Sequence, residues 1–96
     1  MHARVTTVHG NPAEVDAGIE NYRANVQPYV REHGKGSVLL VDRATGDALV
    51  VSFWGDEAAM RASEEAANAL RAQAADRMAV SEEPGVARYE VAIYDL

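Results

Sequence analysis

The chain has 96 residues, of which 48% are hydrophobic and 25% charged, with a formal net charge of −6. It contains no cysteine, which excludes disulfides, thiol nucleophiles and zinc–thiolate sites. Its nine lysine and arginine residues are scattered without forming a basic stripe, which argues against nucleic-acid and anionic-membrane binding. With no leader pattern and no membrane-length apolar run, we expect a single cytoplasmic domain spanning 1–96.

The first two predicted elements are a strand and a long helix. Residues 3–9 are rich in β-branched side chains, which favour a strand. Asn11 is a suitable N-cap, Pro12 suits the first helical position, and Glu14 completes a capping box. Helical spacing of apolar residues then continues until the glycine-rich stretch HGKG. Pro28 lies inside this run and predicts a kink near residues 24–27 because it lacks a backbone donor.

The second half of the chain repeats the alternation of strands and a helix. Two apolar strands separated by the turn RATGD predict a hairpin, and an alanine-rich helix capped by Asp56 follows. Met60, Ala67, Leu70, Ala74 and Met78 mark its apolar face. The predicted strands are 37–42, 48–54 and 86–96, and the helix covers about 55–80. The order βαββαβ predicts a ferredoxin-like α+β fold.

An internal echo links the starts of the two halves. The segment VTTVHGNPAE at 5–14 aligns with VVSFWGDEAA at 50–59, as a duplicated unit, shared capping chemistry or chance would produce. If the first and third strands were parallel neighbours, His9 and Trp54 would lie side by side at their carboxyl ends. Both helix N-termini would then converge at that same end.

The predicted sheet has two apolar faces but only two helices. Leu49, Val51 and Phe53 share one face of the third strand, while Ser52 and Trp54 share the other. Two helices cover only one side of a four-stranded sheet, and the other side is too apolar to leave in water. We therefore expect a homodimer whose sheets pack face to face.

The segment ALVVSFWGDEAAMRA, a strand ending in tryptophan and leading into a helix, resembles the antibiotic-biosynthesis-monooxygenase-like family. Chain length and element order agree with this resemblance over nearly the whole chain. The family implies a dimeric α/β barrel with a pocket between sheet and helices. Its members include cofactor-independent oxygenases of aromatic polyketides and quinols, haem-degrading enzymes, and proteins without known activity.

Only some of the family's functional residues have a counterpart in this chain. Trp54 matches the family's pocket tryptophan, whereas Thr6 or Thr7 stands near the asparagine of the haem-degrading branch, and the second predicted helix has no haem-ligand histidine. The polyketide-oxidising branch has an asparagine and a tyrosine where this chain has Val50 and Met60. Neither known catalytic set is therefore complete.

Several residues are nevertheless candidates for a ligand site. Trp54 could stack on a planar ligand or simply pack in the core, and His9 could act as a base or be a half-exposed strand-end histidine. The phenols of the first helix could hydrogen-bond a quinone or phenol, or pack with their hydroxyls at a rim. Amides can polarise a carbonyl oxygen. The further candidates for substrate binding are Tyr22, Tyr29, Asn25, His33 and Ser52.

Two classes of function remain open. The first is a cofactor-free monooxygenase of a small aromatic or quinol substrate, with His9 as base. The second is a non-catalytic small-ligand binder or structural dimer. Haem degradation is a weaker third option. The three histidines show no metal-ligand spacing, so no metal is expected.

Overall fold

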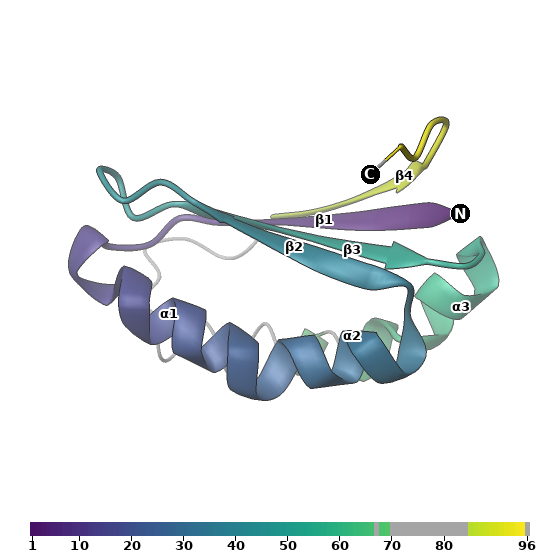
Figure 1. Ribbon diagram of the computed structural model, residues 1–96, viewed down its shortest axis with the longest axis horizontal. Helices are drawn as coiled ribbons and strands as arrows, with labels where there is room; N and C mark the ends of the chain where they lie inside the picture. The colour runs from purple at the N-terminus through teal and green to yellow at the C-terminus, as the bar shows by residue number, and fades with distance from the viewer. Residues whose placement is uncertain (67, 70–84, 96) are drawn as a thin grey trace.

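Four antiparallel strands form one sheet with helices on a single side (Figure 1). The structure is a computed structural model that describes residues 1–66, 68–69 and 85–95. No helix among these residues is both long and apolar enough to cross a membrane. The strands are β1 (His2–Val8), β2 (Gly36–Val41), β3 (Ala48–Trp54) and β4 (Gly85–Glu90), and the α-helices are α1 (Val15–Asn21), α2 (Gln27–His33) and α3 (Glu57–Ala62).

The strand order β2-β3-β1-β4 confirms the ferredoxin-like α+β fold. All three pairings are antiparallel. The expectation that the first and third strands are parallel was wrong. The helical crossover makes β2 parallel to β1, and the hairpin makes β3 antiparallel to β2. β3 is therefore antiparallel to β1. His2, rather than His9, is consequently the register partner of Trp54.

The first helical region is one continuous rod built from four segments. Pro12–Glu14 forms a 3₁₀ turn, α1 follows, Tyr22–Val26 forms a π-helical turn, and α2 completes the rod. The Asn11 side chain accepts a hydrogen bond from the Ala13 amide at 2.9 Å, which confirms the predicted N-cap. The π-helical turn, hereafter the π-turn, covers the predicted kink immediately before Pro28, whose missing amide cannot continue regular bonding.

The helix after β3 also begins at its predicted cap. The carboxylate of Asp56 accepts a hydrogen bond from the Ala59 amide at 2.7 Å. Met60 is 1% exposed and faces the sheet, as predicted. Ser63 ends α3 as a C-cap, and residues 64–66 and 68–69 are again helical. The other predicted apolar positions at 67, 70, 74 and 78 lie outside the described residues.

The last strand is shorter than predicted. β4 ends at Glu90, so the expectation of a strand through 96 was wrong. The Val91 amide still bonds the Met1 carbonyl at 2.9 Å, after which the chain leaves the sheet. The Tyr94 ring then meets the Phe53 ring edge-on at 5.3 Å, against the side of the sheet opposite the helices.

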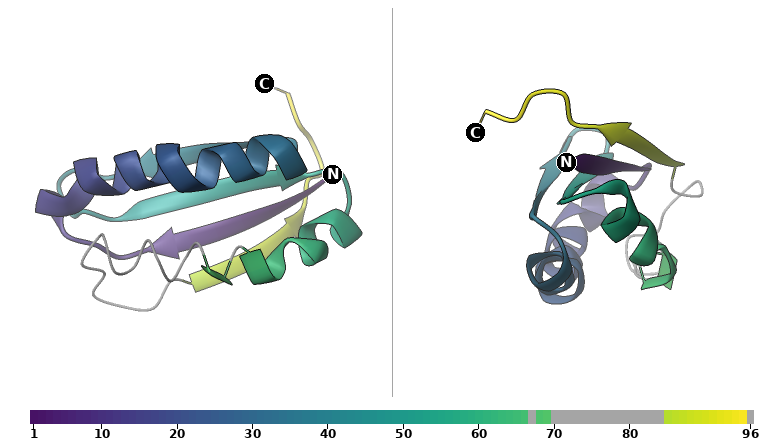
Figure 2. Two further views of the ribbon diagram at one scale, coloured as in Figure 1. Left: turned by 90° about the horizontal axis from the view of Figure 1, so that it is seen from below. Right: turned by 90° about the vertical axis from the view of Figure 1, so that its right-hand side faces the viewer.

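The helices cover one side of the sheet and leave the other open, as the view along the strands shows (Figure 2). The alternation predicted for β3 holds, because Ser52 and Trp54 are buried while Leu49 is exposed. Residues of the open face include Val38, Leu40, Leu49 and Tyr89, each at least 36% exposed. This surface, hereafter the open face, is the one for which the sequence predicted a second copy.

Candidate functional site

The covered side of the sheet is unusually polar for a protein core. Among the residues that the structure describes, five polar or charged ones there are no more than 6% exposed, and three of them lie on the central strands β1 and β3. Interiors of this kind are normally aliphatic, and buried polar groups must find partners or serve a function. The five residues are Arg4, Thr6, Asn21, Ser52 and Ser63.

Arg4 ties the central strand to the end of α3. Its Nη2 donates to the Met60 carbonyl at 2.7 Å and to the Ser63 hydroxyl at 2.6 Å. The Glu64 carboxylate lies 3.5 Å from Nη2 and also accepts from Arg88 Nε at 2.7 Å. Since Arg88 is the register partner of Arg4 on β4, one carboxylate bridges two adjacent strands.

Burial lowers the pKa of the Arg4 guanidinium, and the nearby Glu64 opposes that shift. The group nevertheless stays charged at physiological pH. Its Nε is buried without a hydrogen-bond partner among the described residues. Because Arg4 carries a fixed charge at 4% exposure and one unused donor, it is the main electrostatic feature of this interior.

Trp54 lies in the same interior, at 1% exposure. Its indole Nε1 donates to the Ser52 hydroxyl at 3.0 Å. The Arg4 guanidinium carbon lies 5.2 Å from the indole centroid, within the range of cation–π attraction. The structure therefore brings together two sequence candidates, Trp54 and Ser52, but packs the indole beneath Arg4 instead of exposing it as a stacking surface.

His9 lies at the opposite end of β1 from Trp54. The expected His9–Trp54 neighbourhood was therefore wrong, because it depended on parallel strands. His9 Nδ1 lies 3.4 Å from the Asp47 carboxylate, and both side chains are more than 40% exposed. The two helix N-termini also lie at opposite ends of the sheet, so their predicted convergence was wrong (Figure 1).

Three candidates of the first helical region pair with their own helix. Asn25 donates to the Asn21 side chain at 2.8 Å. The rings of Tyr29 and His33 lie 4.3 Å apart and are tilted by 42°. His33 is about half exposed, next to Glu32 at 3.8 Å. The bond from Asn25 gives the buried Asn21 side chain a partner.

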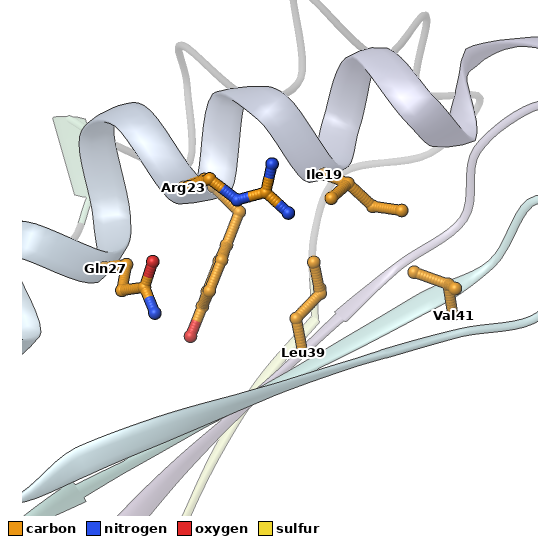
Figure 3. Close-up of a pocket in the computed structure, with 6 residues that line it drawn as sticks. Ile19, Arg23, Gln27, Leu39 and Val41 are labelled. Carbon is orange, nitrogen blue, oxygen red and sulfur yellow. The ribbon is translucent and has the colours of Figure 1, made fainter.

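Tyr22 is separate from that group and lines a cavity of about 250 Å³ between the first helical region and β2 (Figure 3). Its hydroxyl forms a short hydrogen bond with that of Ser37. The π-turn helps to build this cavity, because the Gln27 amide bonds the Tyr22 carbonyl five residues earlier and so aligns the two residues. This cavity, hereafter the side pocket, is lined by six residues: Ile19, Tyr22, Arg23, Gln27, Leu39 and Val41.

Arg4 is the residue that the sequence analysis missed. A signal was available, because the predicted order makes the first strand central and an arginine in its middle must be buried on one face or the other. No cluster of three or more potential metal ligands occurs among the residues that the structure describes.

Sequence comparison identifies relatives but no function. No protein-family model matches the chain. Over 77 residues the chain is 40% identical to the uncharacterised protein Rv2558 of Mycobacterium tuberculosis strain ATCC 25618 / H37Rv. The match covers 78% of this chain and 33% of the relative, so the chain spans about a third of that protein's length.

Comparison with solved structures is more informative about the fold. A Streptomyces coelicolor monooxygenase from the gene ActVA-Orf6, solved in complex with nanaomycin D, matches 99% of this chain and 90% of its own length. The TM-score is 0.79 at 17% identity. An antibiotic biosynthesis monooxygenase matches 97% of this chain and 100% of its own, with a TM-score of 0.73 at 18% identity. The chain therefore has the antibiotic-biosynthesis-monooxygenase-like fold, as the sequence predicted.

Proposed function

We propose that this protein binds a small organic molecule in the side pocket. The observation that carries the proposal is the cavity of about 250 Å³ between the first helical region and β2. It is smaller than the ~300–1,000 Å³ sites that hold drug-sized ligands, which suits a compact molecule. The Streptomyces coelicolor neighbour was itself solved with a small organic ligand, nanaomycin D, which supports small-molecule binding by proteins of this fold.

The composition of the side pocket favours a ligand with an apolar body and a polar end. Ile19, Leu39 and Val41 provide aliphatic walls. The hydroxyl pair of Tyr22 and Ser37 and the Gln27 amide offer hydrogen bonds beside them. This mixture of apolar surface with a few polar groups is typical of small-molecule sites.

A titration followed by amide nuclear magnetic resonance tests the proposal. Quinols, phenols, hemin and fatty acids are added in turn, and we expect at least one class to shift the Leu39 and Val41 signals saturably. Val41→Phe should block this binding because the larger side chain fills the pocket. Ala44→Phe is the control, since Ala44 lies in the exposed hairpin loop and does not line the side pocket. Shifts that persist unchanged in Val41→Phe would place the ligand elsewhere.

Cofactor-free oxygenation of a small aromatic or quinol substrate is a second candidate function. Arg4 favours it, because a buried guanidinium whose Nε has no partner within residues 1–66, 68–69 and 85–95 can stabilise the anion of a phenol next to Trp54. That anion would supply electrons to dioxygen, and one oxygen atom would enter the ring as a quinone carbonyl while the other leaves as water. His9 is too far from Trp54 along β1 to act as the base for such a substrate.

Oxygen consumption with 1-naphthol or a naphthohydroquinone tests this candidate. Catalysis predicts uptake above the spontaneous rate that falls in Arg4→Gln, while Arg61→Gln, an exposed arginine of α3, serves as control. A folded protein that leaves the uncatalysed rate unchanged contradicts the enzyme function without affecting ligand binding in the side pocket.

We also propose that two copies associate through the open face. Leu40 is 51% and Tyr89 57% exposed there, and the apolar residues Val51 and Val5 lie on the two strands between them, on the same face. Contiguous apolar surfaces of this kind usually mark an interface. Leu40→Asp should convert a dimer to a monomer in light scattering, whereas Ala44→Asp, in the exposed hairpin loop, should not. A monomeric parent protein at micromolar concentration contradicts this assembly.

A further inference from the structure

We infer that the side pocket selects a small monocarboxylate, with Arg23 binding its carboxylate. This inference rests on the proposed ligand binding in the side pocket and specifies its chemistry. In Figure 3 the Arg23 side chain runs along the helix, and its guanidinium lies at the helix side of the pocket, between Gln27 on one side and Ile19 on the other. A cation placed above aliphatic walls matches a molecule with an anionic head and an apolar body.

Arg23 has donors available for such a ligand. A guanidinium carries five N–H donors, and among the described residues the contact found for Arg23 is one bond from Nη1 to the Glu20 carboxylate at 2.7 Å. Both side chains of that pair are more than 60% exposed. Exposed pairs contribute little to stability, so a ligand carboxylate can share or replace Glu20 at low cost.

The polar groups beside Arg23 complete the recognition. Gln27 provides an amide N–H₂ within the pocket, and the π-turn holds it in line with Tyr22. The Tyr22 hydroxyl is already bonded to Ser37, so it borders the site without needing the ligand as a partner. Arginine binds carboxylates in fixed planar geometry, which favours a carboxylate over an alcohol of the same length.

The size of the pocket limits the apolar part. Ile19, Leu39 and Val41 surround it with aliphatic surface and offer no second aromatic ring for stacking. A cavity of about 250 Å³ corresponds to roughly eight water volumes at ~30 Å³ each. Octanoate, with about ten non-hydrogen atoms, is therefore a suitable probe, and 1-octanol is its uncharged counterpart.

The test compares these two probes by amide chemical-shift titration of the intact chain. We expect octanoate to shift Leu39 and Val41 at lower concentration than octanol, and Val41→Phe to remove both responses. Arg23→Gln should weaken octanoate binding by on the order of fivefold and leave octanol unchanged. Glu20→Gln should strengthen octanoate binding, because the competing carboxylate is removed. Arg61→Gln, an equally exposed paired arginine on α3, should have no effect.

The outcomes separate this inference from the proposed function. Carboxylate selection is overturned if octanol and octanoate bind equally well, or if Arg23→Gln binds octanoate as the parent does. Either result leaves ligand binding in the side pocket intact. If quinols or phenols bind in the side pocket and octanoate does not, carboxylate selection is likewise overturned while ligand binding stands. If no compound shifts the pocket signals while circular dichroism shows a folded protein, both proposals fail.

Discussion

Removal of the Ser52 hydroxyl should destabilise the protein through Trp54. The indole Nε1 donates to this hydroxyl at 3.0 Å, and the two residues are 1% and 5% exposed, so water cannot replace the lost acceptor. A buried donor without a partner costs about 1–3 kcal/mol, and Ser52→Ala should lower the free energy of unfolding by that amount. In a Trp54→Phe background the same change should cost less than about 0.5 kcal/mol, because no indole N–H remains.

A double-mutant cycle measures this difference. Urea unfolding is followed by far-ultraviolet circular dichroism, since Trp54→Phe removes the chain's single tryptophan. All four proteins are compared at one concentration, because association would shift their apparent stability. A coupling of roughly 1–2 kcal/mol is expected. If Ser52→Ala costs the same in both backgrounds, the hydrogen bond does not hold the indole and our description of this interior is wrong.

Three other predictions concern separate parts of the chain. Gly46→Ala should cost more than about 2 kcal/mol in urea unfolding, because Gly46 has φ of +83° and a Cβ there would lie 2.3 Å from the Asn11 backbone; a cost below about 0.5 kcal/mol would contradict this packing. The hydrogen bond from Arg61 lowers the pKa of Glu57. The pair therefore favours folding above the ordinary carboxyl pKa and loses that contribution as pH falls through the lowered pKa. Arg61→Gln should raise the pKa of Glu57 in a carboxyl NMR titration, and an unchanged pKa would refute the assignment. His9→Ala should leave ligand affinity and any oxygen uptake unchanged, because His9 lies at the opposite end of β1 from Trp54 and does not line the side pocket. Loss of either would show that His9 contributes to the site.

The elements were predictable because their signals are local. The third strand has its predicted bounds, 48–54, since alternating apolar residues are flanked by a turn and a helix cap. Asn11 and Asp56 cap helices as their side chains suggested. The bend before Pro28 followed from a missing amide, although its form as a π-turn did not.

The assembly of the site was harder to predict because it depends on strand direction. The echo between 5–14 and 50–59 reflects two strands that each enter a capped helix, and it contains no information on whether those strands are parallel. That error placed His9 beside Trp54. Arg4 was missed because its position opposite α3 follows from the sheet order and not from its neighbours in sequence.

The proposed function requires a ligand in the space between the first helical region and β2. The most direct measurement is a crystal structure of the protein soaked with a library of fragments of about ten non-hydrogen atoms. We expect fragments over Leu39, between Ile19 and Val41, with a polar group near Arg23 or Gln27. A pocket filled by its own side chains, or fragments bound only at other sites, would contradict it.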